Sequence, residues 1–99
     1  MIIINGLRFE WDADKERGNW RKHGVSFEEA RSVFYDENGL LIHDPDHSEE
    51  EDRYLLLGMS VKPRLLVVSH TYRSHDHVIR LISARAATPQ ERRRYGRIK

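Results

Sequence analysis

The 99-residue chain carries 17 Lys or Arg against 16 Asp or Glu, and it contains no cysteine. This composition excludes disulfide bonds, thiol catalysis and cysteine-ligated zinc. A chain of this length holds one modest core, so residues 1–99 are expected to form a single domain. The first six residues have neither a basic leader nor a long apolar run, which predicts a cytoplasmic protein without a signal peptide or membrane span.

The N-terminal segment predicts short strands followed by a helix. Residues 2–10 contain two apolar strand pieces around an Asn-Gly pair, a dipeptide favoured in tight hairpins. These arms are too short to distinguish a hairpin from one irregular strand. Asp12 is the expected N-cap of a first helix that runs to about Lys22, and Gly24 is expected to end this helix after its basic last turn.

A second helix is predicted to begin at the sequence Ser26 to Glu29, which has the pattern of a capping box. Apolar residues recur there at helical spacing and form one face that should be buried: Phe27, Ala30, Val33 and Phe34.

Three strands are predicted next, over residues 40–43, 53–60 and 64–72. The last two contain continuous apolar runs, which are typical of central strands in a sheet covered on both faces. Residues 44–52 form a loop with six acids in nine residues, a density that favours exposure to water. Short turns join the later strands, so neighbouring strands are expected to be antiparallel.

The last strand, predicted over residues 77–85, combines apolar residues with Arg80 and Arg85. Regular alternation would separate Ala84 from Ile79 and Leu81, and it would place the two arginines on opposite faces unless the strand bends. A guanidinium in an apolar strand is costly unless an anion meets it.

A C-terminal helix is predicted from Thr88, Pro89 and Glu91, which supply an N-cap, a first-turn proline and a capping box. The order of elements predicts an α+β fold. We expect an antiparallel central sheet of about four strands with two N-terminal helices and one C-terminal helix.

Charge is unevenly distributed along the chain. Residues 73–99 contain eight Lys or Arg and two acids, a local charge of +6, whereas the preceding residues carry a local charge of −5. A basic end favours a polyanion such as nucleic acid as the ligand. The alternative is a solvated helix whose arginines pair with acids elsewhere in the chain. If the guanidinium groups are already held by the chain's own carboxylates and leave no open positive hollow, the nuclease hypothesis fails.

Four groups of motifs run through the chain: Phe9-Glu-Trp-Asp12; Asn19-Trp-Arg-Lys-His-Gly-Val-Ser-Phe-Glu-Glu-Ala30; Asp46-His-Ser48 with Arg53-Tyr54; and Ile79-Arg-Leu-Ile-Ser-Ala-Arg85 with Glu91-Arg-Arg. Together they resemble the BrnT family of bacterial toxins, ribonucleases of type II toxin–antitoxin pairs with a RelE-like fold. Ala86 is a departure, because this family is expected to have lysine there, and the basic site is thinner as a result.

The resemblance implies an endoribonuclease that cleaves RNA without a metal or other cofactor and halts translation. It also implies a partner, a BrnA-type antitoxin that covers the toxin and binds operator DNA through a ribbon-helix-helix dimer. The expected assembly contains two toxins and two antitoxins.

Metal-free RNA cleavage requires a base for the 2′-hydroxyl, an acid for the leaving oxygen and cations around the phosphorane. We expect Arg53 and Arg80 to bind the phosphate, with Arg85 as a third if the strand end turns it inward. His23 is the expected proton-transfer group. The expected RNA-binding residues outside this centre are Lys22, Arg92, Arg93 and Arg94.

Each assignment has a structural alternative. Arg53 can pair with the acids before it, Arg80 or Arg85 can hold a helix end, and His23 can cap its helix. The clusters around residues 43–47 and 75–77 contain His and Asp but lack a trusted metal-ligand spacing, so no metal site is expected. His70 is expected to be a hydrogen-bonded core residue on the same face as Tyr72.

Two other function classes remain open at this point. One is a non-catalytic binding module that partners a DNA-binding repressor. The other is a metal-dependent nuclease.

Overall fold

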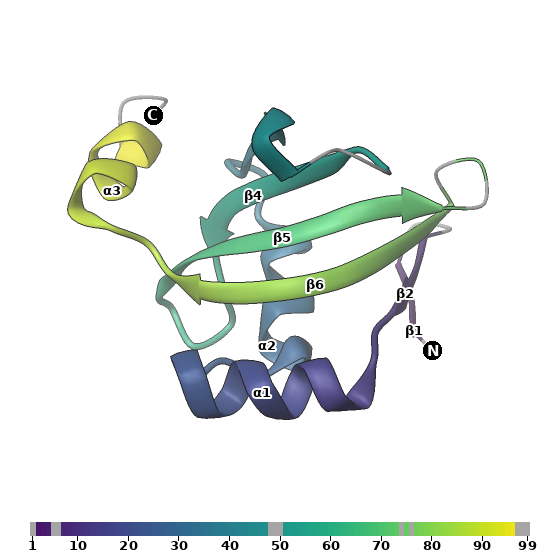
Figure 1. The fold of residues 1–99 in the computed structure, drawn as a ribbon. Coiled ribbons are helices and arrows are strands. Elements are labelled where there is room, and N and C mark those ends of the chain that lie inside the picture. Colours follow the sequence, from purple (N-terminus) through teal and green to yellow (C-terminus); the bar gives the residue numbers. More distant parts are fainter. Residues whose placement is uncertain (1, 5–6, 48–50, 74, 76, 97–99) are drawn as a thin grey trace.

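The computed structural model describes residues 2–4, 7–47, 51–73, 75 and 77–96. These residues form a sheet with helices on both of its faces (Figure 1). In chain order the elements are β1 (Ile2–Ile4), β2 (Leu7–Glu10), α1 (Ala13–His23), α2 (Phe27–Ser32), the 3-10 helix η1 (Val33–Tyr35), β3 (Leu40–Asp44), the 3-10 helix η2 (Pro45–His47), β4 (Arg53–Met59), β5 (Leu65–Arg73), β6 (Val78–Ala86) and α3 (Pro89–Gly96).

The sheet has six strands in the order β1-β2-β6-β5-β4-β3. The four predicted antiparallel strands are β3 to β6, so the α+β fold with its antiparallel centre is confirmed. The expected strand count was low because the short N-terminal pieces also join the sheet. Strand β1 pairs antiparallel with β2, and β2 pairs in parallel with β6. The Asn-Gly pair at residues 5–6 lies outside the described residues.

The first and last helices begin as their sequences predict. The Asp12 carboxylate accepts hydrogen bonds from the N–H groups of residues 14 and 15, and α1 ends at Gly24, which has a left-handed φ of 65°. At α3, Glu91 N–H donates to Thr88 Oγ1 at 3.2 Å, and Thr88 N–H donates to Glu91 Oε1 at 2.9 Å. This reciprocal capping box is confirmed.

The capping box predicted for α2 forms only in part. Ser26 Oγ accepts a hydrogen bond from Glu29 N–H at 3.1 Å, as expected. The Glu29 carboxylate is instead bound by the Arg64 guanidinium, at 2.6 and 2.7 Å, and by the Ser60 hydroxyl at 2.7 Å. Glu29 is 3% exposed, and a buried carboxylate needs a cationic partner, which explains why it turns toward Arg64.

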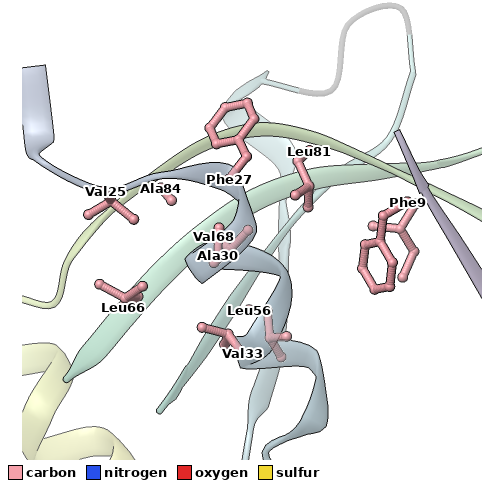
Figure 2. Packing of buried hydrophobic residues seen from close by; sticks show 11 residues of the cluster. Phe9, Val25, Phe27, Ala30, Val33, Leu56, Leu66, Val68, Leu81 and Ala84 are labelled. Atoms are coloured by element: carbon pink, nitrogen blue, oxygen red, sulfur yellow. The ribbon is translucent and has the colours of Figure 1, made fainter. Parts of the chain in front are cut away.

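The main core lies between the sheet and the segment formed by α2 and η1 (Figure 2). The predicted buried face of the second helix is confirmed: Phe27, Ala30 and Val33 are completely buried, and Phe34 packs against them. The core cluster comprises Phe9, Val25, Phe27, Ala30, Val33, Leu56, Leu66, Val68, Ile79, Leu81 and Ala84.

A smaller core lies on the other face of the sheet, beneath α3. Tyr95 of α3 packs on Leu57, Leu65 and Val67, so β4 and β5 are buried on both faces, as their apolar runs predict. The Tyr95 hydroxyl donates to Asp36 Oδ2 at 2.6 Å. Among the described residues, no helix is long and apolar enough to cross a membrane.

Candidate functional site

A register shift in β6 determines which of its arginines share a face. Ser69 of β5 pairs with Ser83, but the next residue, His70, pairs with Leu81. Ile82 is therefore one extra residue in β6, as in a β-bulge, and it shifts the alternation of side chains by one position.

Because of this bulge, Ala84 lies in the main core with Ile79 and Leu81, which corrects the separation expected from regular alternation. Arg80 and Arg85 lie together on the opposite face. Of the two arrangements considered for these arginines, the structure has the one that requires a bend in the strand.

Five residues on the α3 face form one row across neighbouring strands. In the order of the strands they are Asp44, Arg53, Thr71, Arg80 and Glu10, each paired in register with the next. We call this surface the arginine row. Strands lie about 4.8 Å apart, so the Cα atoms of Arg53 and Arg80 are separated by about 10 Å. Both arginine side chains are half-buried, and Thr71 between them is buried.

Arg80 and Arg85, which were predicted to bind phosphate, contact carboxylates of the chain. Arg80 Nη1 donates to Glu10 Oε2 at 2.6 Å, and these side chains are 31% and 32% exposed. Arg85 donates from both terminal nitrogens to the two oxygens of Glu91, at 2.8 and 3.0 Å. Arg85 matches its structural alternative because Glu91 lies in the first turn of α3, whereas Arg80 pairs with the last residue of a strand. Both ion pairs count against the nucleic-acid hypothesis.

The Arg85–Glu91 pair has a clear structural role. Glu91 also caps the first turn of α3, so Arg85 connects that turn to β6. The Arg85 hydrogen bond lowers the pKa of Glu91 to about 2, and the same hydrogen bond raises the pKa of Arg85. Arg85 is thus a residue that holds a helix start.

The structure does not bring His23 or Lys22 to the arginine row. Both lie in the last turn of α1, which runs beside β6 and in the same direction (Figure 1). Asn19 of α1 contacts Ala84, which pairs with Val68. Val68 is three residues along β5 from Thr71, the partner of Arg80, or roughly 10 Å. His23 is one further helical turn along, about 6 Å more.

The basic residues of α3 also lie away from the row. Arg92, Arg93 and Arg94 are exposed, whereas Tyr95 is buried against Leu57 and Val67 at the other end of the face. Leu57 is four residues along β4 from Arg53, or roughly 13 Å. These arginines therefore flank the row on one side.

His70 is a hydrogen-bonded core residue, as predicted. Its ring is fully buried, with Nδ1 3.0 Å from the Val68 carbonyl oxygen and Nε2 3.2 Å from the Tyr72 hydroxyl. Burial lowers the pKa of His70 to about 4. His43 Nε2 lies 3.3 Å from Asp52 Oδ1. Within the described part of the chain, no three His, Asp or Glu side chains are grouped to hold a metal ion.

Sequence reasoning missed Glu10 and Thr71 as members of the site. Glu10 follows the buried Phe9, so alternation alone places it on the other face. Its position beside Arg80 depends on the parallel pairing of β2 with β6, which links segments about seventy residues apart and has no local signal.

The sequence model of a family described as "Ribonuclease toxin, BrnT, of type II toxin-antitoxin system" matches residues 11–91 of the chain. The chain belongs to the BrnT family. Its fold is similar to the crystal structure of the Brucella abortus ribonuclease toxin BrnT, with a TM-score of 0.63 and 19% sequence identity. That match covers 83% of this chain and 97% of the Brucella chain. No match was found among curated proteins. The resemblance to BrnT seen in the sequence motifs is confirmed.

Proposed function

We propose that this BrnT-family chain is a metal-independent endoribonuclease whose centre is the arginine row. In this reaction the 2′-hydroxyl of one nucleotide attacks the adjacent phosphorus, and the products are a cyclic phosphate and a free 5′-hydroxyl. The observation that carries the proposal is the placement of Arg53 and Arg80 on either side of Thr71 on one face of the sheet. Membership of a ribonuclease toxin family supports it.

Arg53 and Arg80 lie on the two strands that flank Thr71. Two guanidinium groups in this arrangement are suited to stabilise a phosphorane, because the negative charge that develops on its oxygens needs hydrogen-bond donors in fixed positions. The ion pair of Arg80 with Glu10 is compatible with this role. A guanidinium has five N–H donors, so the hydrogen bond to Glu10 leaves donors for a phosphate. A partly exposed ion pair contributes only about 0–1 kcal/mol, so RNA can rearrange it at small cost.

The exposed cations outside the row suit contacts with the rest of the RNA backbone: Lys22 of α1 and Arg92, Arg93 and Arg94 of α3. These exposed cations also suit an acidic partner. We propose that the partner is a BrnA-type ribbon-helix-helix antitoxin in a complex of two toxins and two antitoxins, through which the toxin reaches operator DNA. The toxin would act in the cytoplasm by cleaving RNA that is needed for translation.

A second candidate is a non-catalytic module that only binds the antitoxin. The observation that favours it is that Arg80 and Arg85 already contact Glu10 and Glu91. Binding to an acidic partner requires neither a general base nor two guanidinium groups that bind a phosphate.

Incubation of the purified chain with RNA in the presence of a chelator separates these candidates. The ribonuclease proposal predicts fragments that end in a cyclic phosphate and begin with a 5′-hydroxyl. Binding of RNA or antitoxin without cleavage would favour the binding module, and activity abolished by the chelator would indicate a metal nuclease.

A further inference from the structure

Glu10 is the carboxylate best placed to act beside the arginine row. It is the last residue of β2, and it faces away from the main core because the preceding Phe9 is buried in that core. Trp11, the next residue, packs edge-on against Phe27 of α2. The backbone on both sides of Glu10 is thereby anchored, so its carboxylate is held in place beside Arg80.

Stability alone does not explain the contact between Glu10 and Arg80. Both side chains are about one third exposed, and ion pairs in such positions stabilise a fold weakly. Strand β2 is held in the sheet by its own ladder with β6, including the 3.0 Å hydrogen bond from Arg8 N–H to the His77 carbonyl oxygen. The fold therefore does not depend on the ion pair, yet the pair holds the Glu10 carboxylate in a fixed position at an accessible surface.

The histidines His23 and His70 lie elsewhere. His23 is near the opposite end of β6, and His70 is buried on the other face of the sheet. Glu10 Oε2 accepts the hydrogen bond from Arg80, and the structure records no partner for Oε1 among the described residues. The Glu10 side chain is 32% exposed, and a partly exposed carboxylate held through one oxygen is suited to accept a proton.

We propose that Glu10 is the general base of the ribonuclease, an assignment that rests on the proposed function. Glu10 takes the proton of the 2′-hydroxyl as the 2′-oxygen forms its bond to phosphorus and the bond from phosphorus to the 5′-oxygen breaks. The departing 5′-oxygen takes a proton from a water molecule, and the hydroxide that this leaves takes the proton from Glu10, which restores the carboxylate. Arg80 both orients Glu10 and, with Arg53, binds the phosphate.

This assignment also gives the RNA a direction across the sheet. The attacking 2′-oxygen and the leaving 5′-oxygen lie on opposite sides of phosphorus in an in-line displacement. With the base on β2, the nucleotide that supplies the 2′-hydroxyl lies over β2 and β6. The nucleotide that leaves then lies on the Arg53 side, over β4.

The test is single-turnover cleavage of an RNA oligonucleotide by the full chain, with binding measured on the same oligonucleotide carrying a 2′-deoxy group at the cleaved position. Glu10→Gln keeps an oxygen that can accept the hydrogen bond from Arg80, but it is not a base. We expect its cleavage rate to fall about 10²–10⁴-fold with binding unchanged. Glu10→Asp keeps a carboxylate and should recover part of the lost rate. Glu37→Gln removes an exposed charge in a turn and should cleave like the parent chain.

Three results would overturn the assignment. Glu10→Gln at the parent rate, or equal rates for the Gln and Asp variants, would show that no base at this position takes part. A rate loss matched by an equal loss of binding would make Glu10 a residue that only positions Arg80. In each of these three results the parent chain still cleaves RNA, so the proposed function stands. If the parent chain cleaves no RNA, the proposed function fails together with the assignment of Glu10.

Discussion

The side-chain amide of Asn19 takes the place of a neighbouring strand for Ala84. Asn19 Nδ2 donates to the Ala84 carbonyl oxygen and Oδ1 accepts from the Ala84 N–H, both at 2.9 Å. Nδ2 also donates to the Val25 carbonyl oxygen at 2.9 Å. Strand β2 pairs with β6 only as far as Arg80, so the later part of this edge needs another partner. Helix α1 supplies it through Asn19, which is 6% exposed.

Replacement of Asn19 by Ala should therefore destabilise the fold strongly. It leaves buried backbone groups of Val25 and Ala84 without a partner, at a cost of about 2–5 kcal/mol in the free energy of unfolding. Urea denaturation measures this change. Gly18→Ala is a matched control in the same helix, where an added Cβ meets open space and should stabilise α1 by roughly 0.5–1 kcal/mol. A loss below about 1 kcal/mol for Asn19→Ala would mean that water replaces the amide.

Acid should weaken the attachment of α3 through Glu91. The pKa of Glu91 is lowered to about 2 from an ordinary value of 4.5, mainly by its hydrogen bond with Arg85. A lowered carboxyl pKa stabilises the folded state above the ordinary value, and this stabilisation is lost as pH falls from 4.5 toward about 2. Glu91→Gln should lack this dependence and should lose about 1–3 kcal/mol at neutral pH. Denaturation between pH 7 and 2 tests this, and an unchanged acid dependence in Glu91→Gln would contradict it.

The types of the elements could be predicted from the sequence because their signals are local. Asp12, Gly24 and the Thr88–Glu91 box act within one helical turn, and apolar periodicity marks the faces that become buried. The arrangement of the site depends on contacts between distant segments. The extra residue Ile82 has no glycine beside it to signal a bulge, yet it decides that both β6 arginines share a face. The pairing of Arg85 with Glu91 instead of a phosphate is a further consequence of tertiary packing.

The buried ring of His70 should make the free energy of unfolding depend on pH over a higher pH range than Glu91 does. Burial lowers its pKa to about 4 from an ordinary value of 6.5, so the unfolded chain binds a proton here before the folded chain does. The stabilisation is present above pH 6.5 and is lost as pH falls toward 4, by roughly 3 kcal/mol in total. His70→Leu should remove this slope. NMR titration of the histidine ring protons checks the assignment, and a His70 ring that titrates near 6.5 would contradict it.

Arg80 and Arg85 share a face, but they should behave differently when replaced. Arg80→Ala removes a donor from the phosphate site and should lower single-turnover cleavage about 10²–10³-fold, with a stability change below about 1 kcal/mol. Arg85→Ala removes the bidentate contact to Glu91 and should cost about 1–3 kcal/mol in the free energy of unfolding. Its cleavage rate per folded molecule should stay near that of the parent chain. Arg21→Ala, at an exposed position on α1, is the control for loss of one positive charge.

The contrast between these two variants is informative because it separates the site from its scaffold. Cleavage is compared at a temperature where urea denaturation shows every variant to be folded. If Arg80→Ala loses activity only because it unfolds, Arg80 stabilises the sheet through Glu10. Arg53 and Arg80 would then not bind the phosphate together. If Arg85→Ala stays folded but stops cleaving, its guanidinium must leave Glu91 for the phosphate when RNA binds. In that case α3 moves during the reaction, because the contact that fixes its first turn is the one given up.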